Sequence, residues 1–295
     1  MFPSFLPTTV NQLTEPDSIE FASQIQRVDI QTSLLREPIP TSFVCQGSGG
    51  IPIVFLHGFD SSLLEFRRII PIIAPHQAVW AIDLLGFGFT ARLPDCPFSS
   101  ASILTHLQAF WQTKIQQPMI LVGVSMGGAA AIEFTLKYPE FVHQLILIDS
   151  AGFTQPPVLG RFINQPLGNL ATKFLSSPNV RKSIIEKAYY DRSFVTADAQ
   201  LCGALHLAMP HWREALIAFT RNRGYGYLLD RLSAIAQETL IIWGKQDRIL
   251  GITAPPLFIN NLPAARLEWI DNCGHVPHLE QAQITSQLIL DFIVS

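Results

Sequence analysis

The sequence predicts an α/β fold, with a mostly parallel central sheet flanked by helices and a helical cap inserted between strands 6 and 7. Short apolar runs of strand length alternate with helix-like segments from residue 51 to residue 149, and such alternation is typical of parallel strands joined by right-handed crossovers. The alternation stops after Gly152 and resumes at Thr239. Hydrophobic residues make up 48% of the chain and charged residues only 15%, so we expect several strands to be covered on both faces.

The chain divides into three predicted parts. Residues 1–27 form an N-terminal arm with a short amphipathic helix. Residues 28–151 and 233–295 supply the sheet and its helices. Residues 152–232 contain helical segments punctuated by prolines, and we interpret them as a cap over the edge of the sheet. A chain of 295 residues can bury one large core.

The elements follow in order along the chain. Two strands, 28–32 and 41–45, form an antiparallel edge, and Pro38 and Pro40 between them suit a turn because proline cannot donate to a ladder. A helix begins near Ser62, where Ser62-Leu63-Leu64-Glu65 predicts a capping box. The other predicted strands are 51–56, 78–84, 119–124, 144–149, 239–243 and 265–270. The other predicted helices are 99–115, 128–138, 167–175, 179–190, 197–209, 212–221 and 277–294.

A serine lies between two glycines at a predicted strand-to-helix turn. Ser125 follows the apolar run 119–122 and stands between Gly123 and Gly127. A side chain at either glycine would crowd the adjacent strand or the helix. The pattern predicts a nucleophile elbow, in which Ser125 is the nucleophile and the N–H of Met126 is a donor to an oxyanion.

An earlier loop supplies a second donor. The buried run 51–56 ends in His57, Gly58 and Phe59. We expect Gly58 to let the backbone turn tightly, so that the N–H of Phe59 acts beside that of Met126. We interpret His57 as a brace that steadies this loop through hydrogen bonds.

The acid and the base follow the serine in the chain. Strand 239–243 leads to Asp247, which we interpret as the acid, and strand 265–270 leads to His275, which we interpret as the base for Ser125. This order differs from those of chymotrypsin and subtilisin. The inserted segment between serine and acid accommodates the predicted cap.

Two neighbouring residues compete for these roles. Asp149 ends a strand at a position that can also present a carboxylate to the histidine. We favour Asp247 because Trp-Gly-x-x-Asp places it in a turn just past a strand. His278 begins the final helix, so we rank it as supporting or structural. Asp83 is expected to organise the glycine turns that follow it.

Composition excludes several classes of function. The net charge of −3 without a basic run gives no electrostatic case for nucleic acid. Four separated cysteines predict buried reduced thiols, and the histidine spacing predicts no metal site. The first seven residues lack a secretory signal pattern and no run is long enough to span a membrane, so we expect a cytoplasmic protein. No motif specifies an oligomeric state or a cofactor.

At this point the chain resembles the α/β-hydrolase superfamily over about residues 40–295, and more narrowly the chlorophyll dephytylase group of photosynthetic organisms. The narrower resemblance rests on residues 57–62, 80–89 and 272–280, with a weaker echo at 205–206 and 210–212. It implies hydrolysis of the phytyl ester of chlorophyll, which releases phytol and chlorophyllide. Peripheral contact with a membrane would suit such a substrate.

Other functions share these motifs. Met126-Gly127-Gly128 is a general esterase sequence, and similar patterns occur in carbon–carbon hydrolases of meta-cleavage products and in cofactor-free haloperoxidases. A diketone acid would require a cation near Ser125, for which Arg92, Arg161 and Arg213 are candidates. A non-enzymatic receptor for a small ligand is a further alternative. Apolar cap residues favour a hydrophobic ester, although they could equally pack the cap onto the core: Phe162, Ile163, Leu167, Leu170, Phe174 and Leu175.

Overall fold

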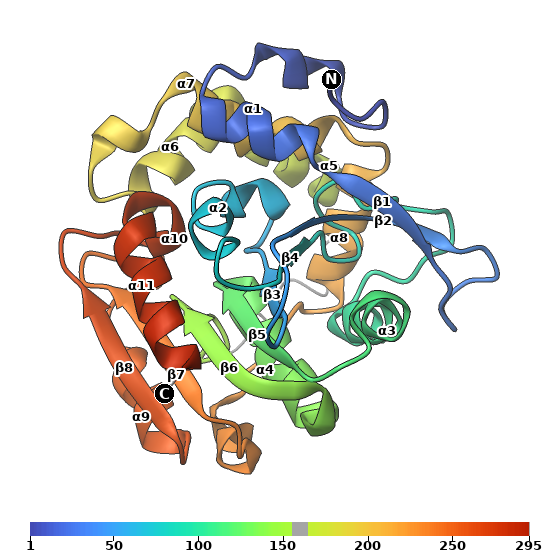
Figure 1. Cartoon of the computed structure of the whole chain (residues 1–295). Coiled ribbons are helices and arrows are strands. Elements are labelled where there is room, and N and C mark those ends of the chain that lie inside the picture. Colours follow the sequence, from blue (N-terminus) through green and yellow to red (C-terminus); the bar gives the residue numbers. More distant parts are fainter. Residues whose placement is uncertain (155–164, 295) are drawn as a thin grey trace.

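The apolar runs of the sequence form the strands of one sheet in the structure, a computed structural model that describes residues 1–154 and 165–294. The strand order is β1-β2-β4-β3-β5-β6-β7-β8 (Figure 1). Strands β1 and β2 are antiparallel at one edge, and the strands from β4 onward run parallel to one another. The strands are β1 (Gln26–Ile30), β2 (Ile39–Gln46), β3 (Ile53–Leu56), β4 (Val79–Ile82), β5 (Met119–Val124), β6 (Val142–Ile148), β7 (Thr239–Gly244) and β8 (Ala265–Ile270).

Helices cover both faces of the sheet, which explains the low charge of the sequence. In β3, Val54 and Leu56 join the core beneath α3, α4 and α9, whereas Ile53 and Phe55 join the core beneath α1, α2 and α11. All four side chains are fully buried. The helices around the sheet are α1 (Pro16–Ser23), α2 (Ile70–Ile73), α3 (Ser100–Phe110), α4 (Met126–Lys137), α9 (Pro255–Asn261), α10 (Pro277–Glu280) and α11 (Ala282–Ile293).

The predicted fold class is confirmed, with local corrections. The turn predicted at Pro40 is wrong, because Pro40 lies inside β2. It precedes the stretch of β2 that pairs with β4, Phe43–Gln46, so its missing N–H interrupts no bond to that strand. The predicted capping box is half confirmed: Ser62 caps a 3-10 helix, Leu63–Phe66, and its hydroxyl accepts from the N–H of Leu64 at 3.4 Å. The other half is wrong, because the carboxylate of Glu65 accepts from the N–H of Gly58 at 3.0 Å.

The helices inserted between β6 and β7 gather at one end of the sheet, next to the N-terminal segment (Figure 1). They are α5 (Gln165–Leu175), α6 (Pro178–Ala188), α7 (Ala197–Cys202) and α8 (Trp212–Arg221). The predicted helix 197–209 is divided, because α7 ends at Gly203 and a 3-10 helix follows at Leu205–Ala208. Arg161, Phe162 and Ile163 lie outside the described residues.

The N-terminal arm is bound to the inserted helices. The N–H of Glu15 donates to Asp198 at 3.0 Å, and the Thr196 hydroxyl donates to the Glu15 carboxylate at 2.6 Å. Arg68, beyond β3, pairs with the same carboxylate at 2.9 Å. Glu15 therefore joins the arm, the inserted helices and the sheet layer. Among the described helices, none has both the length and the apolar character needed to cross a membrane.

Candidate active site

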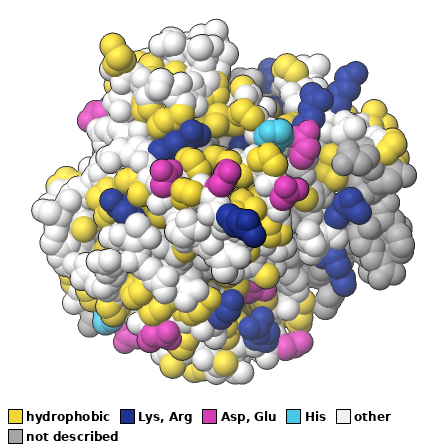
Figure 2. Space-filling view, turned by 90° about the vertical axis from the view of Figure 1, so that its right-hand side faces the viewer, with side chains coloured by type: hydrophobic (Ala, Val, Ile, Leu, Met, Phe, Trp, Pro, Cys, Tyr) yellow, Lys and Arg dark blue, Asp and Glu magenta, His cyan; other side chains and the backbone are white. Residues whose placement is uncertain are grey.

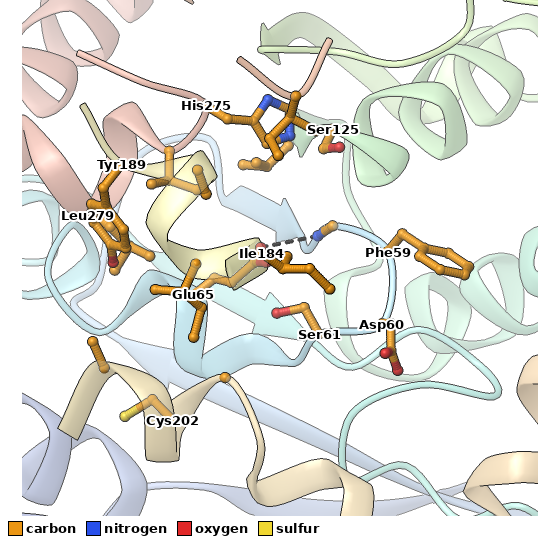
Figure 3. Close-up of a pocket in the computed structure, with 18 of the residues that line it drawn as sticks. Phe59, Asp60, Ser61, Glu65, Ser125, Ile184, Tyr189, Cys202, His275 and Leu279 are labelled. Atoms are coloured by element: carbon orange, nitrogen blue, oxygen red, sulfur yellow. Dashed lines mark hydrogen bonds between the residues drawn. The ribbon is translucent and has the colours of Figure 1, made fainter. Parts of the chain in front are cut away.

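The carboxyl ends of the parallel strands bring the predicted site residues together. The loops after β3, β5, β7 and β8 meet at one edge of the sheet, because β3 pairs with β5 and the strands from β5 to β8 are neighbours. A cavity of about 270 Å³ opens there, and its lining includes Phe59, Ser125 and His275. Figure 3 shows Ser125 and His275 at one end of this cavity, Cys202 towards the other, and Glu65 between them.

Ser125 occupies a strained turn that its neighbours maintain. Its φ of 52° and ψ of −116° are rare for a residue with a side chain. Its N–H donates to the carbonyl of Ile148 at 3.0 Å, and its carbonyl accepts from Ala151 at 2.9 Å. A Cβ on Gly123 would collide with the carbonyl of Gly127, and one on Gly127 would collide with that of Leu56. The predicted crowding at both glycines is confirmed.

Asp247 and His275 form a hydrogen-bonded pair. The two residues are nearly buried, and Nδ1 of His275 lies 3.0 Å from Oδ2 of Asp247. The other carboxylate oxygen accepts from the N–H groups of Ile249 and Leu250, at 2.7 and 3.1 Å. Burial alone would raise the pKa of Asp247, but the hydrogen bond and charge of His275 and these two N–H groups lower it below its ordinary value.

Asp149, the competing acid, lies beside this pair and has another role. It is fully buried, and its Oδ1 accepts from the N–H of Gly244 at 3.2 Å. Burial, and then the negative charge of Asp247, raise the pKa of Asp149 well above its ordinary value, which favours its protonated form. A protonated carboxyl cannot stabilise an imidazolium by charge. The contact of His275 with Asp247 therefore favours Asp247 as the acid.

The same three side chains could be read as metal ligands. Asp149, Asp247 and His275 each place a ligand atom within 4.8 Å of the other two. A metal would require an ionised Asp149, which the raised pKa opposes, and would compete with the bond between Asp247 and Nδ1 of His275. The donor set therefore fits a proton-transfer site better than a metal centre.

His57 braces the loop after β3 as predicted, but the tight turn of this loop is at Asp60 and not at Gly58. The Nδ1 atom of His57 bonds the carbonyl of Gly58 at 2.8 Å, and Nε2 accepts from the N–H of Leu84 at 3.1 Å. The residue with positive φ is Asp60, at 50°, and not Gly58. Gly58 matters for space, since a Cβ there would lie 3.6 Å from Cβ of Ser125 and 3.3 Å from Glu65.

The two predicted oxyanion donors are backbone N–H groups of residues that directly follow Ser125 and Gly58. Met126 is the first residue of α4, directly after Ser125, and is buried. Phe59 follows Gly58, and its ring packs on Phe87 and Phe219 at centroid distances of 5.9 and 6.2 Å. These aromatic contacts tie the Phe59 side chain to the loop after β4 and to the inserted helix α8, and Phe59 also lines the cavity.

His278 and Asp83 occupy supporting positions. His278 is fully buried in α10, where burial lowers its pKa to about 3, and its Nε2 lies 4.0 Å from Glu65. Asp83 accepts from the N–H groups of Leu63 and Phe89, both at 2.7 Å, as expected for a residue that organises the glycine turns. Burial raises its pKa to about 7.

Four charged residues that were not predicted there line the cavity: Asp60, Glu65, Arg67 and Arg181. Arg92 instead is bound to the carbonyls of Gly86 and Gly88. The sequence around Glu65 matches a capping box, so its hydrogen bond with the N–H of Gly58 was not predicted. No local pattern distinguishes the two arginines from surface arginines.

Comparison with known proteins agrees with this geometry. A family model described as alpha/beta hydrolase fold matches residues 51–282. The chain belongs to the α/β-hydrolase family. This α/β-hydrolase is therefore an enzyme by family, which disfavours the receptor alternative.

Two relatives and one solved structure are similar to this chain. The α/β-hydrolase is 32% identical to the alpha/beta hydrolase domain-containing protein VTE7 of Arabidopsis thaliana, over 99% of this chain and 90% of VTE7. It is 26% identical to 2-hydroxy-6-oxo-2,4-heptadienoate hydrolase of Pseudomonas putida, over 90% and 97% of the two chains. The structure of a thermophilic esterase from Thermogutta terrifontis superposes with a TM-score of 0.77 at 21% identity, over 91% and 98%.

Replacement of Asp247 by Asn is expected to lower kcat by about 10⁴-fold, as when the acid of a triad is neutralised. Asp149→Asn should lower kcat by less than about tenfold, because Asn reproduces the donor and acceptor of a protonated carboxyl. Steady-state kinetics with a p-nitrophenyl ester measures both. A larger loss for Asp149→Asn would assign the acid to the position after β6.

His57→Gln should change how stability depends on pH. Burial lowers the pKa of His57 to about 3, so between pH 6.5 and 3 the unfolded chain binds a proton that the folded chain does not. This group alone therefore removes about 1.4 kcal/mol of stability per pH unit as the pH falls through that window. Urea unfolding at pH 7, 5.5 and 4.5 should show the deficit of the variant shrinking towards low pH. A constant deficit would contradict a neutral buried His57.

Proposed function

We propose that this α/β-hydrolase is a serine hydrolase that cleaves carboxylic esters through an acyl-enzyme. The observation that carries the proposal is the bond of 3.0 Å between His275 and Asp247, at the cavity that also exposes the strained Ser125. Because Asp247 engages Nδ1, the other ring nitrogen of His275 is the one that can serve Ser125. A nucleophile, a base and an acid that orients the base are thus assembled on separate loops.

The reaction follows from these positions. His275 removes the proton of Ser125 as its oxygen attacks the ester carbonyl, and Asp247 stabilises the imidazolium. The N–H groups of Phe59 and Met126 stabilise the tetrahedral oxyanion. His275 then gives the proton to the departing alcohol. Water, activated by the same histidine, hydrolyses the acyl-enzyme and restores Ser125, so these steps use no cofactor.

We further propose a hydrophobic ester, such as the phytyl ester of chlorophyll, as the substrate. Apolar side chains from both the sheet layer and the inserted helices line the cavity: Leu64, Leu175, Ile184, Ile185, Val276 and Leu279. Each methylene of a long alcohol that leaves water for such a wall contributes about 0.8 kcal/mol. The full-length similarity to VTE7 is consistent with a shared substrate class.

The outer face of the inserted helices supports contact with a lipid surface. Leu170 and Phe174 on α5 are 66% and 63% exposed, so they do not pack the cap onto the core. Figure 2 shows hydrophobic side chains mixed with charges of both signs on the visible face, an arrangement without the single-sign field that nucleic acid requires. We propose that Leu170 and Phe174 touch a membrane or micelle when the substrate is delivered.

One observation favours a second candidate, hydrolysis of a carbon–carbon bond in a diketone acid. Arg67 lines the cavity and is only 2% exposed, and its Nε and Nη2 atoms are buried without a hydrogen-bond partner. A substrate carboxylate would satisfy these donors. Turnover of such an acid that is lost in Arg67→Met, with p-nitrophenyl ester hydrolysis retained, would favour this candidate.

Ser125→Ala should abolish labelling by a fluorophosphonate probe and hydrolysis of p-nitrophenyl esters, because it removes the attacking oxygen. Gel fluorescence and absorbance at 400 nm, roughly the wavelength of the released phenolate, measure the two losses. Ser150→Ala is the matched control, since Ser150 is buried behind the elbow and its loss removes no predicted catalytic atom. Undiminished labelling of the Ser125 variant would exclude Ser125 as the nucleophile.

Long-chain and phytyl esters should react with a higher kcat/KM than acetate esters, because the apolar wall binds the added methylenes. Chromatography after incubation with chlorophyll in detergent should show chlorophyllide and phytol. Leu170→Ser combined with Phe174→Ser should lower the rate on vesicle-bound substrate but not on a dispersed short ester. Rapid hydrolysis of short esters, with neither chlorophyll product formed and no vesicle binding, would leave a general esterase.

A further inference from the structure

Helix α6 crosses the cavity and contacts both catalytic loops. Ile184 and Ile185, in the middle of the helix, line the cavity, as does Ala188 at its end. Arg181, in the first turn, reaches the loop that carries Phe59. From Arg181 to Ala188 the helix rises about 10 Å, a length comparable to the width of a catalytic site.

The N-terminal end of α6, the first end, is held by Asp60, the residue after Phe59. Arg181 donates from Nη1 to Oδ2 of Asp60 at 2.7 Å and from Nη2 to its carbonyl at 3.2 Å. The same Nη2 also donates to the carbonyl of Gly203. Asp60 is 5% exposed and has a positive φ of 50°, so its carboxylate and its backbone are both constrained.

Two more inserted elements bind the same carboxylate. The indole N–H of Trp212 donates to Oδ1 of Asp60 at 2.8 Å, and Nε2 of His206 lies 3.1 Å from the same oxygen. Burial would raise the pKa of Asp60, but His206, Arg181 and Trp212 outweigh it and lower the pKa. Asp60 is therefore an anion on which α6, the 3-10 helix Leu205–Ala208 and α8 converge. These contacts give His206 and Trp212 a structural role.

The C-terminal end of α6, the second end, is held at the base loop, the loop after β8 that carries His275. The N–H of His275 donates to the carbonyl of Ala188 at 2.6 Å. The carboxylate of Glu280 accepts from the N–H of Gly274 at 2.7 Å, and also from Tyr190 at 3.1 Å and Asp191 at 2.6 Å. One buried carboxylate therefore joins the chain leaving α6 to the residue before His275.

We propose that α6 is a spacer that sets the distance between the oxyanion loop and the base loop, and that Asp60 and Glu280 are the positioning residues at its two ends. The inference rests on the proposed function, because it concerns the alignment of Phe59 and His275 around Ser125. Misplacement of reacting groups by about 1 Å can reduce a rate about 100-fold. Loss of either anchor should therefore reduce kcat although neither residue touches the reacting atoms.

Arg181→Met tests the first anchor, because it keeps an apolar side chain and removes the hydrogen bonds to Asp60 and Gly203. We expect kcat for p-nitrophenyl acetate to fall by about 10- to 100-fold with KM changed by less than about threefold. The rate of fluorophosphonate labelling should fall by the same factor. Asp60→Asn and Glu280→Gln should behave alike, and Arg181→Lys should recover part of the rate by restoring the charge.

Asp198→Asn is the matched control. Asp198 is also a buried carboxylate on an inserted helix, at 3% exposure, but it binds the arm at Glu15 and neither catalytic loop. This variant should lose thermal stability and keep kcat. If Asp198→Asn lost as much kcat as Arg181→Met, the cause would be a general loosening of the inserted helices, and the proposal that α6 is a spacer would be wrong.

Two other outcomes are decisive. Folded Arg181→Met and Glu280→Gln proteins that label at the wild-type rate would overturn the spacer while leaving the serine hydrolase intact. If the wild-type chain itself resists labelling, both the proposed function and the spacer fail. Arg181→Met carries the test for the first anchor if Asp60→Asn does not fold, because Arg181 lies at the cavity surface and not in the sheet core.

Discussion

The close approach of the elbow to β3 is the constraint on which the rest of the site depends. Gly127 lies so near the carbonyl of Leu56 that no side chain fits between them. This contact places the start of α4 beside the loop after β3, so Met126 and Phe59, the two proposed oxyanion donors, come from neighbouring segments. The absence of a side chain at Gly127 therefore brings the proposed nucleophile, Ser125, next to the loop that follows β3.

Buried aspartates surround this point, and their environments separate them into two kinds. Burial raises the pKa of Asp149 and Asp83, and both bind backbone N–H groups that shape the loops. Asp247 and Asp60 face imidazole, indole or guanidinium donors that lower their pKa despite burial. The pKa of a buried aspartate is therefore lowered at the two positions where the carboxylate bonds to an imidazole, an indole or a guanidinium group, one in the proposed triad and one in the contacts that hold α6.

The sequence predicted the sheet, because an apolar run ending in a turn is a local pattern. The same pattern indicated Ser125, Asp247 and His275, which the structure brings to one edge of the sheet. It did not predict the cluster on Asp60, since Trp212 lies 152 residues away and no local periodicity joins the two. Glu65 was misread because its spacing from Ser62 matches a capping box, although the folded loop offers a nearer donor. The turn assigned to Gly58 is made by Asp60, whose positive φ is stabilised by tertiary contacts.

The arm-to-cap contact has a consequence for synthesis of the chain. Thr14 and Glu15 leave the ribosome early, but their partner Asp198 lies 184 and 183 residues later. At about 5 to 20 residues per second, the arm waits roughly 10 to 40 s before its partner exists. During that time the apolar side chains of the arm, including Phe21 and Leu13, lack their final surroundings. Until the chain near residue 198 is made, the apolar side chains of the arm are therefore available for contacts that the folded protein does not contain.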